Sequence, residues 1–504
     1  MFTKLSNGQL IISPVHPLAH TDTALRNEVL KWSKSITTPN NLFLTHPSSI
    51  NFPGAVKSGF GVNSVTFHIM HKQTDVTQSK VSKKFVFSDP NAKTLYSTGL
   101  YAAPGQAIRV NRSSIPFTKK IYLVIGAHSD YLGQHGAESE DWRRMPIVSS
   151  SFLLDSTFQF ASSPFGGLIY IAISPDEPSI EADLTFEKVI SAPYFKLGVT
   201  TLSNWKGQLK NSKAPWGEIL SDKVIITLPD STLQKINNPE ELLTLWDKIL
   251  VTEFELSQLP CPFIRPTRIV LDEQISNGSM HSGYPIMIMN SPSTDHLSET
   301  VIINPQRLLK PSDGGANWGF FHEIGHNLEN WEWIFDGTVE VGCNFYSLYV
   351  FDQIIKTRTG AHIAIKDSMQ NKLMRNFFAK GATYDEYQQE PFLGLIPFMQ
   401  LQKQFGWEPF KKVFSWYLEY RSYDYQMADD DDTQKANIFK IDRFVERFSM
   451  VTNRNLVAFF KAWGIPVSKS VIERLKKFET WFPNELKPFV DASKKKLHHS
   501  ADTN

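Results

Sequence analysis

The chain has 504 residues, of which 41% are hydrophobic and 12% aromatic, a composition typical of a soluble globular protein that buries its own cores. At roughly 150 residues per domain, this length predicts two to four packing units. The 52 Lys and Arg nearly balance the 51 Asp and Glu, which excludes the strong positive field that attracts nucleic acid.

The amino terminus and the apolar runs argue against insertion into a membrane. Ser, Pro and His interrupt the first 22 residues, so the apolar core of a signal peptide is not visible. The longest apolar run, residues 166–173, is far shorter than the ~20 residues that span a bilayer. We expect no transmembrane segment and a soluble protein that is either cytoplasmic or exported by an unconventional route. The oligomeric state stays open.

Residues 1–49 are read as an amino-terminal extension, in which residues 20–36 have the apolar spacing of a helix. From 50 to 190, short runs alternate apolar and polar side chains, and clusters of Gly, Pro, Asn and Asp separate them. This pattern predicts an antiparallel β-sandwich-like domain. The predicted strands are SVTFHIM at 64–70, KKFVFSD at 83–89, KKIYLVIGAH at 119–128, TFQFASS at 157–163 and GLIYIAI at 167–173.

Residues 191–357 contain both the two-residue apolar period of strands and the 3.6-residue period of helices. A strand is expected in 215–229, a helix in 238–257 and a strand in 265–276. They are therefore predicted to form an α+β catalytic domain. Residues 358–504 change to a 3.6-residue period and predict a helical bundle with a polar tail. The helical runs are 389–406, 408–421, 438–453 and 455–464. The expected fold class is multi-domain α+β.

Two polar segments near the end of the chain are interpreted as solvated. The acidic run at 429–432 lacks the alternating spacing and central Gly of a calcium loop, so a solvated loop is favoured. The tail at 491–504 carries a Lys triplet and paired His, which are more typical of a polar tail than of a binding patch.

The segment HEIGHN at 322–327 carries the chemistry that stands out most. His322 and His326 are four residues apart, so on a helix both imidazoles project from one face and can bind a single metal ion. Neutral imidazole suits zinc. Glu323 lies about 100° round the helix, where it can reach a water molecule but not the metal. That position is typical of a general base.

A hydrolytic zinc site commonly has three protein ligands and one open position, and Glu340 is the candidate for the third ligand. Asn344 lies four residues after Glu340, and its side chain could accept a hydrogen bond from a liganding His. The alternative is two ordinary helices with core or solvated histidines. Metal binding is favoured, because PSDGGANWGFF at 311–321 supplies bulky residues that would bury the first helix, and a second helix carries Glu and Asn at matched spacing.

HEIGHN followed by TVEVGCNFYSLY at 338–349 resembles the M60 (enhancin-type) zinc peptidases, a gluzincin-like family with HExxH and a later liganding Glu. The resemblance covers about 50–357, and AWGIPVS at 462–468 extends it to the helical tail. Further stretches that carry it are TGLYAAPGQ at 98–106, SPFGGLIYI at 163–171, APWGEI at 214–219 and MHSGYPI at 280–286.

The resemblance implies that His322, His326 and Glu340 bind Zn²⁺ and that Glu323 is catalytic. It also implies a protein or glycoprotein substrate, among mucins and other heavily O-glycosylated proteins. Zinc-assisted hydrolysis usually needs one more hydrogen-bond donor for the oxyanion, and the candidates are Tyr284, His281 and Tyr346. Each of these three is at least as well explained as a structural residue.

Several aromatic and thiol side chains near the motif have two readings. Trp318, Trp331 and Trp333 could pack on sugar rings, but core packing is the commoner role. Cys261 and Cys343 are too few for a disulfide framework, and buried thiols are favoured, although Cys343 could approach the metal.

Three functions stay open: an active endopeptidase on glycoproteins, a non-catalytic adaptor of the same fold, and a glycan-binding module with structural zinc. A structural site is closed by four ligands, commonly with Cys, and three ligands without a Cys pattern disfavour the last reading. Relatives of the fold include vertebrate ion-channel-associated proteins with degraded motifs. The intact Glu323 favours the peptidase, because an adaptor has no reason to keep it.

Overall fold

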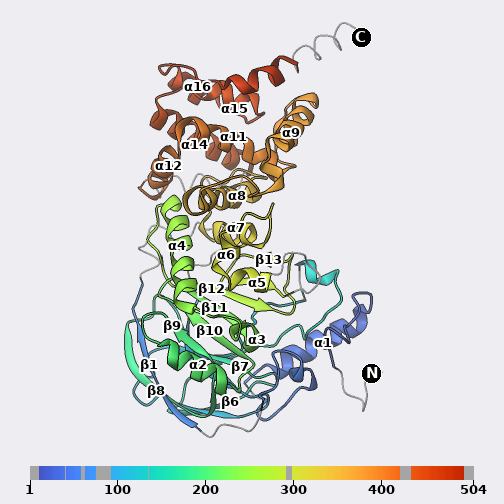
Figure 1. The fold of residues 1–504 in the computed structure, drawn as a ribbon, viewed down its shortest axis with the longest axis vertical. Helices are drawn as coiled ribbons and strands as arrows, with labels where there is room; N and C mark the ends of the chain where they lie inside the picture. Colours follow the sequence, from blue (N-terminus) through green and yellow to red (C-terminus); the bar gives the residue numbers. More distant parts are fainter. Residues whose placement is uncertain are drawn as a thin grey trace. The chain divides into compact units, whose positions relative to one another are not determined.

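The computed structural model is α+β, as predicted, and describes residues 11–39, 41–57, 63–74, 92–133, 135–290, 298–419 and 433–492 (Figure 1). The chain divides into two compact units. The first unit comprises Met1–Ser79, Asp89–Lys248 and Pro262–Leu308, and the second comprises Lys80–Ser88, Ile249–Cys261 and Leu309–Asn504. Both sheets belong to the first unit.

The first sheet has eight strands, and every recorded pair of neighbours is antiparallel. Their order is β5-β4-β7-β2-β8-β3-β6, with β1 also paired to β8. The strands are β1 (Asn63–His71), β2 (Thr94–Ala102), β3 (Ile108–Asn111), β4 (Ile121–Ile125), β5 (Ser150–Leu153), β6 (Phe158–Ala161), β7 (Gly167–Ile173) and β8 (Ile180–Ser191).

One apolar core is shared by the two halves of this sheet. Ile121, Leu123 and Ile125 of β4 are fully buried, and the same cluster contains Leu184 and Phe186 of β8 from the other half. The β4 side chains between them are only partly buried, as expected for a strand with one face on the core. The predicted antiparallel, sandwich-like region is therefore confirmed, and the β2–β8 pairing joins its halves into one sheet.

The second sheet has six strands in the order β13-β14-β12-β11-β10-β9 and is mixed, with parallel pairs at β9–β10, β11–β12 and β12–β14. The strands are β9 (Tyr194–Lys196), β10 (Trp216–Leu220), β11 (Val224–Pro229), β12 (Thr267–Asp272), β13 (Met280–His281) and β14 (Ile286–Met289).

The single strand predicted at 215–229 is wrong, because this segment forms the antiparallel hairpin of β10 and β11. The turn depends on Ser221, whose Oγ accepts hydrogen bonds from the backbone N–H groups of Lys223 at 3.0 Å and Val224 at 3.1 Å. Such side-chain bonds offer the backbone an alternative to a continuing strand.

The helix predicted at 238–257 is α4 (Pro239–Ser257), which buries Leu242, Leu243, Trp246, Ile249 and Leu250 at helical spacing. The predicted amino-terminal helix is also confirmed. Residues of α4 up to Lys248 belong to the first unit and those from Ile249 to the second. The helices that lie wholly in the first unit are α1 (Thr23–Ile36), η2 (Pro47–Ile50), η3 (His135–Glu138), α2 (Leu202–Asn211), α3 (Asp230–Leu233), α5 (Ser298–Ile302) and α6 (Pro305–Leu308).

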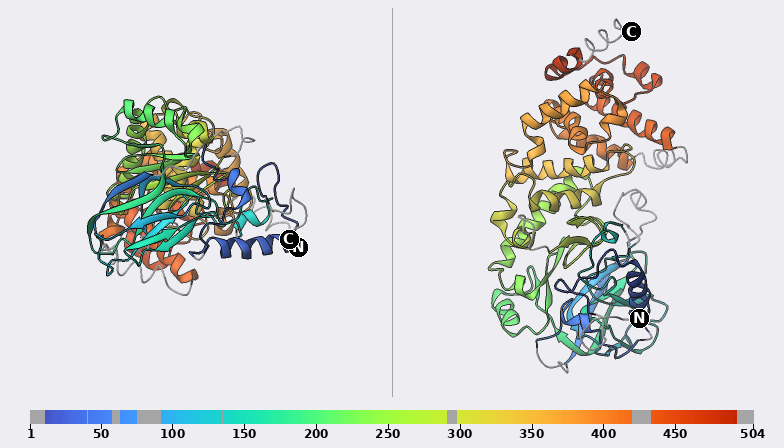
Figure 2. Two further views of the ribbon diagram at one scale, coloured as in Figure 1. Left: turned by 90° about the horizontal axis from the view of Figure 1, so that it is seen from below. Right: turned by 90° about the vertical axis from the view of Figure 1, so that its right-hand side faces the viewer.

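The second unit is helical after residue 309, and each predicted helical run after residue 358 contains a helix (Figure 2). Aromatic side chains fill its core, among them Phe345, Phe398, Phe410, Phe444 and Phe448. The helices are α7 (Ala316–Leu328), α8 (Val339–Val350), η4 (Phe351–Ile355), η5 (Ile363–Ile365), α9 (Asp367–Ala379), α10 (Tyr384–Tyr387), α11 (Pro391–Phe405), α12 (Glu408–Glu419), α14 (Thr433–Thr452), α15 (Val457–Ala462), α16 (Lys469–Leu475) and η6 (Asn484–Leu486).

Three predictions concern segments outside the described residues: the strand at 83–89, the acidic run at 429–432 and most of the tail at 491–504. In the parts of the chain that the structure describes, no helix has both the length and the apolar character needed to cross a membrane.

Candidate metal centre

Two neighbouring helices of the second unit, α7 and α8, supply a compact group of metal-ligating side chains. Two hydrogen bonds connect the helices. Ser347 Oγ donates to the carbonyl oxygen of Trp318 at 3.2 Å, and Tyr346 OH donates to the carbonyl oxygen of Leu328 at 3.3 Å. Gly325 lies at the contact, because a Cβ there would meet the backbone of Cys343 at 2.9 Å. The absent side chain lets the helices approach closely.

His322, His326, Glu340 and Cys343 each offer one ligand atom, and these four atoms lie within 4.8 Å of one another. Nε2 of His322 is 3.2 Å from Glu340 Oε2, and Nε2 of His326 is 3.5 Å from Glu340 Oε1. The Nε2 atoms of both imidazoles therefore face one carboxylate. The group could hold a metal ion.

A second layer of hydrogen bonds fixes His322. Its Nδ1 lies 3.0 Å from Oδ1 of Asn344, as the spacing on α8 had suggested. Trp318 Nε1–H donates to the same oxygen at 2.8 Å, and Asn344 Nδ2 donates to the backbone carbonyl of Glu340. With its oxygen turned towards His322, Asn344 favours the tautomer that carries hydrogen on Nδ1 and leaves Nε2 to bind a metal.

His326 has a corresponding partner that the sequence reasoning missed. Its Nδ1 lies 3.0 Å from Oε2 of Glu329, a fully buried carboxylate just after the end of α7. A buried carboxylate behind a liganding imidazole is a common outer partner of metal sites. The available sequence signal was the three-residue spacing from His326.

The electrostatics of the group favour positive charge. Hydrogen bonds from His322 and His326 hold the pKa of Glu340 well below its usual range, although burial opposes them. Burial alone would lower the pKa of His326, but hydrogen bonds with Glu329 and Glu340 and the nearby charge of Glu323 raise it to about 10. Burial raises the pKa of Glu329 to about 7. The carboxylates around the two imidazoles therefore favour a positive charge in this group.

Glu323 lies on α7 between the two histidines and is 7% exposed. Its charge raises the pKa of both His326 and Cys343. The helix that carries the two histidines therefore also carries a buried carboxylate between them.

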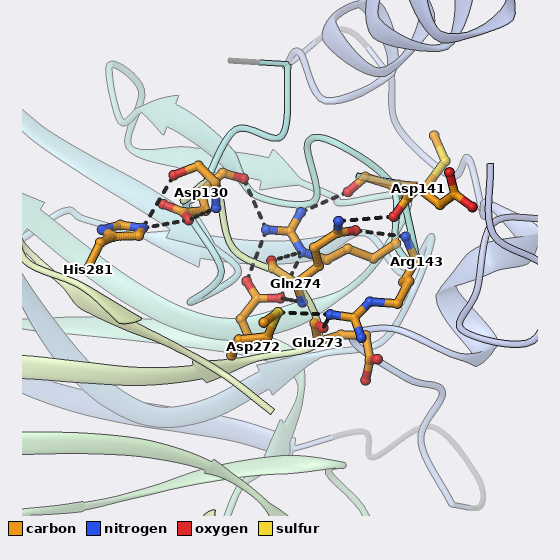
Figure 3. Close-up of polar contacts among 11 residues, drawn as sticks. Asp130, Asp141, Arg143, Asp272, Glu273, Gln274 and His281 are labelled. Carbon is orange, nitrogen blue, oxygen red and sulfur yellow. Dashed lines mark hydrogen bonds and ion pairs between the residues drawn. The ribbon is translucent and has the colours of Figure 1, made fainter. Parts of the chain in front are cut away.

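Tyr284 and His281, proposed as oxyanion donors, both belong to the first unit. His281 Nε2 is 2.7 Å from Asp130 Oδ2 (Figure 3), and its Nδ1 is 2.8 Å from the carbonyl oxygen of Ser282. Tyr284 OH accepts a hydrogen bond from Leu95 N–H at 3.2 Å. These contacts give both residues structural roles, and their part in catalysis stays a prediction.

The same figure shows the polar network around Asp130 and Asp272 (Figure 3). Arg144 forms a bidentate ion pair with Asp272: its Nε donates to Oδ1 at 2.7 Å and its Nη2 donates to Oδ2 at 3.0 Å. Both side chains are 0% exposed. Asp272 ends β12, so this pair ties the sheet to the segment after β4.

The remaining aromatic candidates differ in exposure. Tyr346 is 1% exposed, and its hydroxyl already donates to a carbonyl. Trp318 is buried and donates its indole N–H to Asn344. Trp333 is also buried, and its ring stacks on Phe414 with the centroids 4.6 Å apart. Trp331 is 38% exposed and is the one of these three tryptophans that is not buried.

An HExxH helix followed by a helix that carries a glutamate, within this α+β architecture, identifies a metallopeptidase fold. Residues 188–464 match the family described as peptidase M60, enhancin and enhancin-like, and residues 76–186 match the N-terminal domain of M60-like peptidases. The first match covers more than half of the chain, and the protein belongs to this family.

Curated relatives include TRPM8 channel-associated factor 2 of Homo sapiens, with 35% identity over 79% of this chain and 41% of the relative. TRPM8 channel-associated factor 3 of Rattus norvegicus is also 35% identical, over 83% of this chain and 43% of the relative. The chain thus spans less than half the length of these curated relatives.

Solved structures with the same fold include the ZmpB metallopeptidase from Clostridium perfringens, with a TM-score of 0.61 and 16% identity over 83% of this chain and 80% of that chain. IMPa from Pseudomonas aeruginosa, solved in complex with an O-glycopeptide, has a TM-score of 0.60 and 14% identity over 91% and 59%. A conserved protein of unknown function from Bacillus anthracis gives 0.62 and 21% over 85% and 81%.

Proposed function

We propose that this protein is a zinc-dependent endopeptidase that hydrolyses peptide bonds in O-glycosylated, mucin-like proteins. The convergence of His322, His326 and Glu340 beside Glu323 carries the proposal. Two imidazoles and one carboxylate are a common protein ligand set of catalytic zinc.

The donor chemistry fits zinc, with Nε2 of His322, Nε2 of His326 and a carboxylate oxygen of Glu340 as its ligands. When bound, the zinc ion supplies Lewis-acid chemistry, which polarises a peptide carbonyl and lowers the pKa of a water molecule from ~15.7 towards ~7. Asn344 and Glu329 orient the two imidazoles through their Nδ1 atoms.

Glu323 has the role of general acid and base. Its carboxylate oxygen takes a proton from the attacking water molecule and then gives that proton to the nitrogen of the leaving amine. The buried setting of Glu323 limits competing hydration of this carboxylate. The same group therefore serves both halves of the reaction.

The substrate class is proposed from the family and from one surface side chain. IMPa, which shares the fold, binds an O-glycopeptide in its solved complex. In this chain the partly exposed Trp331 follows the metal motif by five residues, and we infer that its aromatic side chain contacts a sugar of the substrate. Lys440 Nζ lies 3.6 Å from the Trp331 ring centroid, a cation–π contact that covers one face of the ring.

A second candidate function is that of a non-catalytic binding protein. Relatives with about one-third identity are named TRPM8 channel-associated factors, and these names favour an adaptor role for part of the family. The two candidates differ in what they require of Glu323. An adaptor works without its carboxylate, whereas a peptidase does not.

The test is mass spectrometry of the products after zinc-loaded protein is incubated with a mucin-type glycoprotein, before and after enzymatic removal of its O-glycans. We expect cleavage by the wild type that is lost after deglycosylation, and no cleavage by Glu323→Ala in either case. Cleavage of both substrate forms would remove the glycan requirement. No cleavage by the wild type in any arm would favour the adaptor.

A further inference from the structure

We propose that the Cys343 thiolate is a fourth ligand of the metal ion, so that four protein donors close the resting centre. The inference rests on the proposed metal site and adds a ligand to it. From the sequence, a packing role was favoured for this thiol, and approach to the metal was the alternative.

The distances around Cys343 agree with a shared metal ion. Its Sγ lies 3.5 Å from His322 Nε2 and 3.9 Å from Glu340 Oε2. With Zn–N of ~2.1 Å and Zn–S of ~2.3 Å, two ligands at a tetrahedral angle are about 3.6 Å apart. Both separations are compatible with four donors around one metal ion.

The position of Cys343 follows from the geometry of the two helices. Glu340 and Cys343 are three residues apart on α8, so their side chains leave the same face of the helix. Gly325 on α7 lies between the histidines and lets the backbone of Cys343 come close. A bulkier residue at 325 would move the sulfur away from the imidazoles.

The surroundings of Cys343 are unusual for a thiol that only fills space. The side chain is 0% exposed, yet its sulfur contacts an imidazole nitrogen and a carboxylate oxygen. Free cysteines usually behave as small hydrophobes. Cys261, the other free cysteine, does not belong to the metal-ligating group and serves as a control.

Coordination involves no change of oxidation state. The thiol gives its proton to solvent, and a sulfur lone pair forms the bond to the metal. A catalytic site keeps one position open for water or substrate, and here Cys343 occupies that position at rest. Substrate hydrolysis then requires displacement of the sulfur, and loss of this side chain should make cleavage faster.

The test is X-ray absorption at the zinc edge of the full chain loaded with one equivalent of zinc. We expect one sulfur at ~2.3 Å together with nitrogen and oxygen ligands at ~2.0–2.1 Å in the wild type. The sulfur signal should be lost in Cys343→Ala and Cys343→Ser and retained in Cys261→Ala. The wild-type spectrum is decisive even if a variant fails to fold.

The outcomes separate this inference from the proposed function. Zinc bound only through nitrogen and oxygen in the wild type overturns the fourth ligand and leaves the peptidase proposal intact. A wild type that binds no zinc overturns both. Unchanged or slower cleavage by a folded, zinc-loaded Cys343→Ala contradicts the closed resting state.

Discussion

Gly325→Ala tests the close approach of α7 and α8 on which the metal centre depends. The added Cβ would lie 2.9 Å from the Cys343 carbonyl oxygen, 2.9 Å from Tyr346 Cβ and 3.0 Å from Cys343 Cα. Backbone and Cβ atoms cannot rotate out of the way. The two helices must therefore move apart by several tenths of an ångström.

The expected magnitude combines two opposing effects. Alanine in a helix interior is favoured over glycine by ~1 kcal/mol, whereas overpacking a well-packed core costs ~1–3 kcal/mol. The net loss in free energy of unfolding is ~0–2 kcal/mol. Because Glu340 moves with α8 while His322 and His326 stay on α7, zinc affinity should fall as well.

Gly207→Ala on α2 is the matched control, because an added Cβ there meets nothing within 4 Å. We expect this variant to gain up to ~1 kcal/mol from helix propensity alone and to bind zinc as the wild type does. Urea unfolding of the metal-free proteins and chelator competition for zinc measure the two effects. An equal gain in stability for both variants, with wild-type zinc affinity at Gly325→Ala, would refute the reasoning.

Three further changes have defined outcomes. Asn344→Ala removes the acceptor facing His322 Nδ1, and chelator competition should show a ~10–100-fold loss of zinc affinity; unchanged affinity would deny Asn344 this role. Asp272→Ala leaves buried Arg144 without its carboxylate and should cost ~3–5 kcal/mol in urea unfolding; a loss below ~1 kcal/mol would contradict that. Burial lowers the pKa of His128 from 6.5 to about 3. As the pH falls from 6.5 to about 3, the unfolded chain is therefore protonated before the folded one, and the free energy of unfolding decreases by up to ~1.4 kcal/mol per pH unit. His128→Phe should flatten this loss in urea unfolding at several pH values, and an identical slope would exclude His128.

The proximity of the candidate ligands was predictable because it depends mostly on local geometry. Helical periodicity alone puts His322 and His326 on one face of α7, and the short connection to α8 brings Glu340 near them. Glu329 was missed because its contact needs the chain to leave the helix and return the carboxylate to His326. The contact of Cys343 with the other candidate ligands could not be predicted, because it depends on the distance between α7 and α8.

For the fold, a period-2 run predicted strands such as β4, because one face of that strand lies on the core and the other is only partly buried. The β10–β11 hairpin was hidden because nearly all side chains of both strands are buried, which erases the alternation. The order of the strands in the sheet could not be predicted from the sequence either. The pairing of β2 with both β7 and β8 joins residues far apart in the sequence and is set by tertiary packing.

The most direct test of the central claim compares Glu323→Gln with the wild type in a peptide-bond cleavage assay at matched zinc occupancy. The proposed mechanism predicts one zinc per chain and equal zinc affinity in both proteins, with cleavage only by the wild type. Equal cleavage by the two zinc-loaded proteins would show that Glu323 does not move the proton.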